Sequence, residues 1–333
     1  MTSRHTAVFD HLETMTDARG LFEHADGTSR RVEHGYCTDD NARMLVVTSR
    51  EDDADAAYGL SRVALAFTLA AQVADGRVHN RMNASGRWTD RPTTDDCWGR
   101  SLWGLGVAAT QHDDPDVNAR ALAGFDAGIR QRSPWPRAMA FAALGAAEVI
   151  AHDPSHRRAT ALIEDALIVI GEPVPEPWVW PEQRLTYANA TLAEAIIAAG
   201  MALDDAAALE RGLAMLTWLL DQETKRGHLS VTGVGGRSGA DDQPQFDQQP
   251  IEVAAMADAC WRAHTITGDS MWLRGVAVAA DWFDGINDTG APMRDHCSGG
   301  GFDGLLVDGV NINQGAESTL ALISTMQRAG ALA

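Results

Sequence analysis

The chain has no hydrophobic run long enough to cross a membrane. Apolar residues make up 45% of its 333 positions, but none of the runs approaches the roughly 18–20 consecutive apolar residues that a spanning helix needs. The segment Met1–Thr6 leads into an amphipathic pattern and not into the apolar core of a signal peptide. We therefore expect a cytoplasmic protein with no membrane partner and with ample material for a large core.

Positive charge is also scarce. The chain carries 27 Lys and Arg residues against 46 Asp and Glu residues, a formal net charge of −19, and Lys225 is its one lysine. A chain with this balance repels phosphate backbones and anionic lipid headgroups. The composition therefore excludes nucleic acid as a partner and favours a neutral ligand.

Cysteine is sparse, and the chain has no Cys-x-x-Cys motif. The four thiols are widely spaced, which is typical of reduced cysteines and not of a disulfide framework: Cys37, Cys97, Cys260 and Cys297. His34 with Cys37, and His296 with Cys297, leave a zinc site as an alternative, but their loose spacing favours ordinary hydrogen-bonded structure. No Gly-Lys-Ser/Thr follows the glycine-rich loop at 298–303, so it is not a phosphate-binding loop. We expect no metal and no cofactor.

Helical periodicity, in contrast, runs through almost the whole chain. Ala, Leu and Met dominate the apolar segments, and alternating β-branched patterns are few. Pro and Gly are not concentrated in any linker, so we predict a single domain over residues 1–333. The pattern predicts an all-α fold of twelve helices, at residues 5–16, 38–50, 55–74, 95–111, 116–130, 134–151, 155–169, 187–203, 205–221, 248–267, 270–285 and 313–328.

The predicted helices alternate between two kinds. One kind is amphipathic, with a charged face for solvent; the other is rich in Ala, Gly and Met and opens with a polar or aromatic stretch. Six helical hairpins whose second helix begins with such a stretch indicate a repeat architecture. We predict that they close into an (α/α)6 barrel, with a linear solenoid as the alternative. In a barrel the polar openings converge at one end, and the connections 17–37, 76–94, 171–186, 222–247 and 286–312 form the walls of a cleft.

The first opening, His34 to Arg43, has the highest density of reactive groups. It reads His-Gly-Tyr-Cys-Thr-Asp-Asp-Asn-Ala-Arg. Thr38 or Asp39 suits the N-cap of the helix that follows, because a short oxygen-bearing side chain accepts the unpaired N–H groups of the first turn. Capping leaves the second Asp, the Asn and the Arg unexplained, and an Arg one turn on can hold a carboxylate in place. The stretch therefore predicts a site at a helix terminus.

A second acidic opening lies at 244–252, where Pro250 fits the first turn of a helix that also carries Glu252. Acids, amides, Arg and Trp around one cleft, without a nucleotide motif, are typical of a glycoside hydrolase. Such an enzyme uses one carboxylic acid to protonate the leaving oxygen and a second carboxylate to activate water or attack carbon. We predict Glu252 as the acid and Asp40 or Asp39 as the base, at the roughly 6.5–9.5 Å separation of an inverting enzyme.

Several loop aromatics and the remaining polar openings predict how the substrate is held. A flat apolar ring beside hydrogen-bonding groups suits the C–H face of a sugar. We expect substrate contacts from His34, Tyr36, Arg43, Trp88, Trp98, Arg100, Trp135, Trp180, Tyr187, Asn189, Asp247, Gln248, Gln249, Gln314 and Glu317.

The stretches 34–43, 246–252 and 313–317 together resemble a group of bacterial (α/α)6 domains that occur alone or fused to glycosyltransferases. Within that group the chain is similar to the actinobacterial methylmannose polysaccharide hydrolase family. The resemblance implies an inverting endo-α-mannosidase that cuts α-1,4-linked 3-O-methylmannose polysaccharide, with Glu252 and an Asp of the first opening as the catalytic pair. The stretch 187–191, Tyr-Ala-Asn-Ala-Thr, departs from the Tyr-Asp-Asn-Ala-Arg of the wider group, which bears on the identity of the sugar.

Three readings stay open beside this one. The chain could be another α/α-barrel carbohydrate-active enzyme, a catalytically silent sugar-binding domain, or a zinc-dependent enzyme. In the first two the partner is still a neutral oligo- or polysaccharide. Endo or exo cleavage and the oligomeric state do not follow from the sequence.

Overall fold

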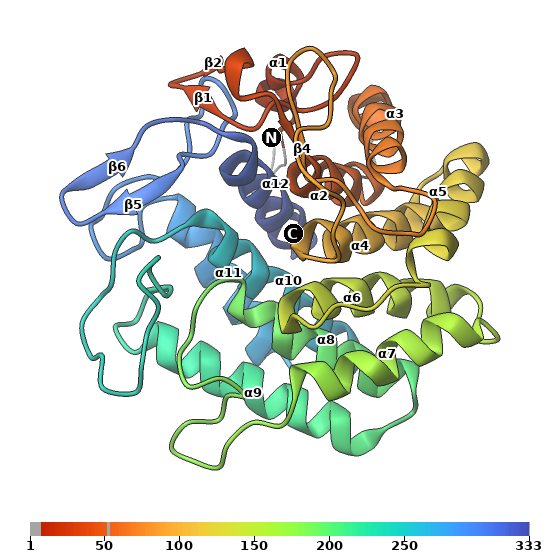
Figure 1. Cartoon of the computed structure of the whole chain (residues 1–333). Helices are drawn as coiled ribbons and strands as arrows, with labels where there is room; N and C mark the ends of the chain where they lie inside the picture. The colour runs from red at the N-terminus through yellow and green to blue at the C-terminus, as the bar shows by residue number, and fades with distance from the viewer. Residues whose placement is uncertain (1–7, 52–53, 333) are drawn as a thin grey trace.

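The computed structural model describes residues 8–51 and 54–332 (Figure 1). Helices dominate this part of the chain, and each helix predicted from the sequence is present, with most ends within three residues of the expected positions. The helices are α1 (Asp10–Met15), α2 (Thr38–Ser49), α3 (Ala54–Ala71), α4 (Asp96–Gln111), α5 (Pro115–Gly128), α6 (Pro136–His152), α7 (Arg157–Ile170), α8 (Asn189–Ala202), α9 (Ala206–Thr224), α10 (Pro250–Thr267), α11 (Met271–Phe283) and α12 (Ala316–Gly330). The first helix, expected over 5–16, begins at Asp10, and positions 5–7 lie outside the described residues.

The even-numbered helices form a closed ring. Each of them packs on the next, from α2 through α12, and α12 packs back on α2. The odd-numbered helices lie outside this ring, as Figure 1 shows. The fold is therefore the predicted (α/α)6 barrel, and the linear solenoid is wrong because its last repeat would not contact its first.

The pairing within the hairpins differs from the prediction. The outer helices α3, α5, α7, α9 and α11 each pack chiefly on the inner helix that precedes them, and α1 packs on α12. The connections from an inner helix to the next outer helix are short, whereas those from an outer to an inner helix are long. A short connection keeps two antiparallel helices in contact. The inner helix, which opens with polar residues, is therefore the first helix of each hairpin and not the second.

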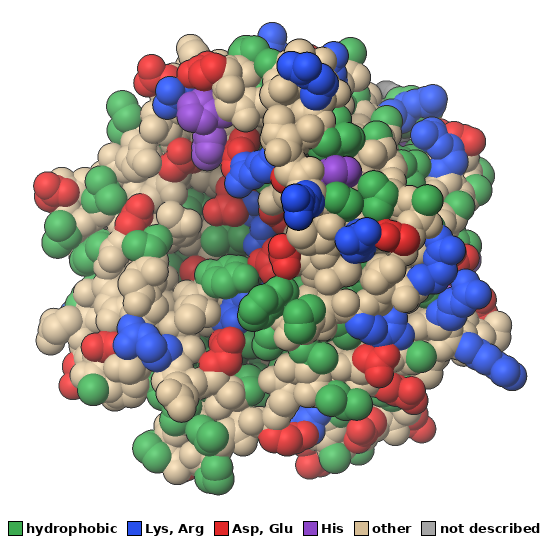
Figure 2. All heavy atoms as spheres, in the orientation of Figure 1, with side chains coloured by type: hydrophobic (Ala, Val, Ile, Leu, Met, Phe, Trp, Pro, Cys, Tyr) green, Lys and Arg blue, Asp and Glu red, His purple; other side chains and the backbone are tan. Residues whose placement is uncertain are grey.

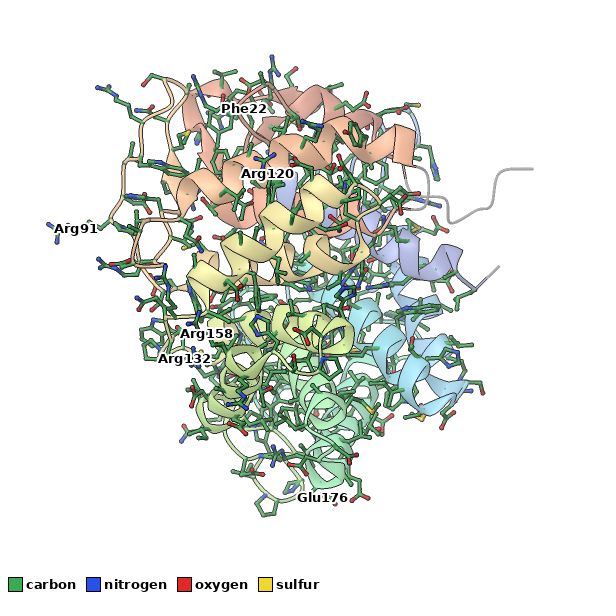
Figure 3. The ribbon with its side chains drawn as sticks, turned by 90° about the vertical axis from the view of Figure 1, so that its right-hand side faces the viewer. Phe22, Arg91, Arg120, Arg132, Arg158 and Glu176 are labelled. Atoms are coloured by element: carbon green, nitrogen blue, oxygen red, sulfur yellow. The ribbon has the colours of Figure 1, made fainter. Side chains whose placement is uncertain are left out.

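The inner helices are rich in Ala and Gly because they pack closely. A Cβ on Gly106 of α4 would lie 2.3 Å from the carbonyl oxygen of Gly145 on α6, and a Cβ on Gly104 would lie 2.6 Å from that of Ala42 on α2. Larger side chains would force the ring apart. The outer helices instead carry a charged face, and Figure 3 shows Arg120 of α5 and Arg158 of α7 on that outer surface.

Strands are few, as the sequence predicts, and serve the rim of the barrel. They form three antiparallel pairs: β1 (Ala25–Asp26) with β2 (Ser29–Arg30), β3 (Tyr36–Cys37) with β4 (Arg81–Met82), and β5 (Gly304–Leu306) with β6 (Gly309–Asn311). A 3-10 turn, Val32–His34, precedes β3. The backbone of Gln248 pairs with Leu305 of β5, which ties the loop before α10 to the loop before α12. These pairings hold the long connections at the end of the barrel where the inner helices begin.

Two further predictions concern membranes and thiols. Across the described residues, none of the helices combines the length and the apolar character that a membrane span requires. The four cysteines are unpaired: Cys37, Cys97 and Cys260 are buried, and Cys297 is exposed.

Candidate active site

A cavity of about 330 Å³ opens at the rim where the inner helices begin. Figure 2 shows acidic and basic side chains gathered in a hollow near the middle of this face. Carboxyl and guanidinium groups dominate the lining, which consists of Glu23, His24, Cys37, Asp39, Asp40, Arg43, Arg81, Arg100, Asp247, Gln249, Pro250, Asp303, Asn311, Gly315, Glu317 and Ser318. Seven residues predicted from the sequence lie in it: Asp39, Asp40, Arg43, Arg100, Asp247, Gln249 and Glu317.

Arg43 connects two of the carboxyl groups. Its Nη2 donates to Asp40 Oδ1 at 2.5 Å, and its Nη1 donates to Glu317 Oε2 at 2.8 Å. Asp40 lies on the same helix one turn earlier, whereas Glu317 comes from α12. The side chain of Asp40 is 3% exposed and that of Glu317 is 40% exposed, so Glu317 is the one that water reaches readily.

These two carboxyl groups have opposite pKa shifts. Burial raises the pKa of Asp40 to about 7, although the charge of Arg43 acts against the rise. For Glu317, burial also acts to raise the pKa, but the charges of Arg43 and Arg100 outweigh it and lower the pKa below its ordinary value. Near pH 7 about half of Asp40 is therefore protonated while Glu317 is ionised, which is the pairing that general acid–base chemistry needs.

Asp39 is fixed by a separate set of contacts. Its Oδ2 accepts a hydrogen bond from Asn80 Nδ2 at 2.9 Å, and its Oδ1 lies 3.2 Å from Nη1 of Arg100. The N-cap of α2 is Cys37, so neither Thr38 nor Asp39 caps the helix in the way the sequence suggests. Asp39 is instead a cavity-wall carboxylate with an arginine partner.

Asp247 and Asp303 also line the cavity. Burial raises the pKa of both carboxyl groups. Asp303 accepts hydrogen bonds from Ser318 Oγ at 2.7 Å and from the backbone N–H of Gly315 at 2.8 Å, so α12 holds it. Asp247 packs so closely on β5 that a Cβ on Gly304 would lie 2.2 Å from its Oδ1.

Glu252 is not among the residues that line the cavity. It is 5% exposed, and its carboxylate accepts hydrogen bonds from the backbone N–H groups of Ala188 and Asn189 and from Asn189 Nδ2. Ala188 is the N-cap of α8 and has no side-chain oxygen to offer, so Glu252 caps α8 from a neighbouring helix. Burial and the nearby charge of Glu223 raise its pKa to about 7, while the two backbone N–H groups act in the other direction.

Of the predicted aromatic contacts, two lie at the surface of the rim and three do not. Trp98 and Trp180 are fully buried, and Trp88 is stacked on His79 with ring centroids 5.2 Å apart. Trp135 and Tyr187, in contrast, are 57% and 47% exposed.

The remaining predicted contacts serve the scaffold or lie at its edge. Tyr36 donates its hydroxyl to Asp17, and Gln248 donates to Asp288 at 2.7 Å. Gln314 is buried and bonded to Ser298 and Asp295. Asn189 belongs to the Glu252 cap, and His34 is exposed, with its ring 5.0 Å from that of His24. None of these five is among the residues that line the cavity.

Sequence reasoning missed several lining residues, chiefly Glu23, His24, Arg81 and Asp303. They lie on the connections 17–37, 76–94 and 286–312, which were predicted as cleft walls, but nothing in the sequence separates these residues from their polar neighbours. The pairing of Arg81 with Glu23 joins two of these loops, and only the fold brings the two residues together.

A metal centre finds limited support in these residues. Within the described chain, one group of three possible ligands has donor atoms within 4.8 Å of one another, namely Glu23, Cys37 and Asp40. Arginines already pair with both acids, and burial raises the pKa of the Cys37 thiol well above its ordinary value, which disfavours the thiolate that a metal requires. Of the alternative zinc pairs, His34 with Cys37 and His296 with Cys297, only Cys37 belongs to this group.

No protein-family model matches the sequence, and no curated protein is similar to it at a significant level. Solved structures, however, share its fold over nearly its whole length. Cellobiose 2-epimerase from Bacillus thermoamylovorans superposes with a TM-score of 0.70 at 10% identity, covering 97% of this chain and 96% of the other. An α-amylase from Clostridium perfringens gives 0.64 at 11% identity, over 98% and 99% of the two chains.

The GH76 α-mannanase of Bacteroides thetaiotaomicron gives a TM-score of 0.60 at 12% identity, over 88% of this chain and 86% of the other. Together these likenesses show that the chain has the (α/α)6-barrel fold of carbohydrate-active enzymes. The fold is common to epimerases, isomerases and glycoside hydrolases, so the reaction has to be argued from the cavity.

Proposed function

We propose that this chain is a glycoside hydrolase that cleaves α-mannosidic bonds in a neutral polysaccharide, with 3-O-methylmannose polysaccharide as the first candidate substrate. One observation carries the reaction class: a single cavity holds carboxyl groups with raised pKa values, among them Asp40 at about 7, together with Glu317, whose pKa is lowered. The substrate class is supported by the net charge of −19, by the fold shared with an α-mannanase, and by the sequence resemblance.

In this mechanism Asp40 is the general acid and Glu317 the general base. Asp40 gives its proton to the leaving glycosidic oxygen, and Glu317, held ionised by Arg43 and Arg100, takes a proton from the water that attacks the anomeric carbon. The inverting course comes from the resemblance, and proton NMR of the first-formed anomer tests it. The earlier assignment, with Glu252 as the acid and Asp39 or Asp40 as the base, is the alternative within the same reaction.

The cavity favours hydrolysis over epimerisation. Epimerisation at the carbon beside a carbonyl needs a base that removes a proton from that carbon and an acid that returns one, and histidine commonly has this role near neutral pH. Among the described lining residues, histidine is represented by the exposed His24 alone. Glu23 and five further lining residues, in contrast, are Asp or Glu. Such a carboxyl-rich site is better suited to glycosidic bond cleavage.

The test is to incubate the purified chain with 3-O-methylmannose polysaccharide, unmethylated α-mannans, amylose, cellobiose and free mannose, and to identify the products by mass spectrometry and NMR. We expect oligosaccharides from a mannose polymer. Glu317→Gln and Asp40→Asn should each lower kcat by roughly 10²–10⁴-fold, and Glu210→Gln, an exposed acid on α9, is the matched control.

Each other outcome has a distinct meaning. Conversion of cellobiose or mannose to an epimer or isomer, without cleavage of any polymer, would replace the hydrolase with an epimerase or isomerase. Loss of turnover in Glu252→Gln with full activity in Glu317→Gln would restore the alternative carboxyl pair. Tight polymer binding without any product would indicate the catalytically silent sugar-binding domain.

A further inference from the structure

Two large aromatic side chains stand exposed beside the cavity. Trp135 and Tyr187 are 57% and 47% exposed, and they lie immediately before α6 and α8, two successive inner helices that pack on each other. Because folding leaves about half of each ring in contact with water, these positions forgo much of the stabilisation that burial of a large aromatic ring gives. Their burial therefore does not account for their presence at the rim.

Both rings are anchored by the same pair of acids at the start of α4. The indole Nε1–H of Trp135 donates to Asp95 Oδ1 at 3.0 Å. Burial raises the pKa of the Tyr187 hydroxyl, and the negative charge of the next residue, Asp96, adds to the rise. The guanidinium of Arg137 lies over the Tyr187 ring, 4.7 Å from the centroid, and Glu182 holds Arg137 through two hydrogen bonds of 2.7 and 2.9 Å. The two rings are thus held in place before any ligand arrives.

The anchors connect this pair of rings to the cavity. Asp96 lies 3.7 Å from Nη2 of Arg100 on the same helix, and Nη1 of Arg100 lies 3.2 Å from Asp39. Arg100 and Asp39 both line the cavity. A chain that leaves the cavity along the start of α4 therefore meets Tyr187 and Trp135 directly.

We propose that Trp135 and Tyr187 form a platform that binds successive neutral sugar rings of a polysaccharide on one side of the cleavage site. This inference rests on the proposed function and adds the residues that hold the polymer outside the cavity. Aromatic faces stack on the C–H faces of sugars, and the carboxylates of Asp95 and Asp96 accept hydrogen bonds from their hydroxyls. The same acids repel anionic polymers.

The experiment compares long and short substrates in Trp135→Ala and Tyr187→Ala. On a mannose polymer of ten or more units we expect KM to rise about tenfold for either variant, because each variant loses one ring that stacks on a sugar, while kcat changes little. On a di- or trisaccharide that reaches only the cavity the loss should be several times smaller. Trp135→Phe keeps a ring and should recover most of the affinity for the polymer.

Tyr58→Ala is the matched control, because Tyr58 is also exposed but lies on the outer helix α3. An equal loss on long and short substrates, or no loss on either, overturns the platform. If the wild type cleaves nothing, the proposed function fails, and calorimetric binding of the intact polymer decides the platform separately: binding that Trp135→Ala weakens supports it. Absence of binding by the wild type, or binding indifferent to both substitutions, overturns it.

Discussion

Replacing Glu252 with Gln distinguishes a structural role from a catalytic one. In the structure this carboxylate accepts from three N–H donors at the start of α8 and is 5% exposed. A glutamine keeps one acceptor oxygen and turns an NH2 group toward the remaining donors. One or more buried donors are then unsatisfied, at a cost of about 1–3 kcal/mol.

The expected change in thermal stability follows from the size of the chain. At about 2.1 cal/mol/K per residue, 333 residues give an unfolding entropy of roughly 0.7 kcal/mol/K. A loss of about 2 kcal/mol therefore lowers Tm by about 3 °C. Glu252→Ala removes every acceptor and should lower it by about twice as much. Turnover at temperatures well below Tm should stay within about tenfold of the wild type.

The assay combines differential scanning calorimetry with the polymer-cleavage measurement, and Glu210→Gln on the solvent face of α9 is the control, expected within about 0.5 kcal/mol of the wild type. A variant Glu252→Gln with unchanged Tm and kcat reduced a thousandfold would refute the capping argument. That result would establish Glu252 as the general acid predicted from the sequence.

Three more predictions concern the buried charges and the cavity. Asp258 accepts from Arg50 and Arg328; Asp258→Asn should cost about 3–5 kcal/mol in urea unfolding at pH 7. Burial acts against ionisation of Asp258, but the arginine charges lower its pKa to about 2. The stabilisation from these ion pairs is therefore fully present above the ordinary Asp pKa and should vanish as the pH falls toward 2. A difference in unfolding free energy between wild type and Asp258→Asn that stays constant from pH 7 to 2 would contradict this. kcat/KM should fall above about pH 7 as Asp40 loses its proton, and on the acid side only below the ordinary Glu pKa, as Glu317 gains one; a rate still rising at pH 8 argues against this pair. Gly304→Ala should displace Asp247, whose Oδ1 would lie 2.2 Å from the new Cβ, and lower kcat/KM, whereas Gly59→Ala meets open space and should not.

The helices and their division into inner and outer ones were predictable because both depend on local patterns. The 3.6-residue period places each helix, and the alternation of Ala-rich with charged helices separates inner from outer. The direction of the hairpins was mispredicted. The polar openings follow the long connections, but the short connections decide which helices pack together. Length of connection was the more informative feature.

The candidate site was predictable only in part, because its residues interact across the fold. Asp40, Arg43 and Glu317 lie in conspicuous openings, and the structure brings them together. Glu252 looks equally conspicuous, but the helix end that uses it belongs to α8, whose own N-cap is an alanine. Trp180 reads as a loop aromatic, yet it stacks on Trp218 of α9 with ring centroids 5.9 Å apart. Such contacts depend on partners distant in sequence, which no local pattern reveals.

The ion pair between Arg43 and Glu317 joins the first inner helix to the last. The proposed base is therefore made long after the proposed acid during translation. A polypeptide released before residue 316 would carry Asp40 and most of the barrel but no Glu317, and its ring would lack the helix that closes it. Incomplete copies of this chain should consequently be unable to degrade polysaccharide, and catalytic competence should begin only once α12 has docked against α2.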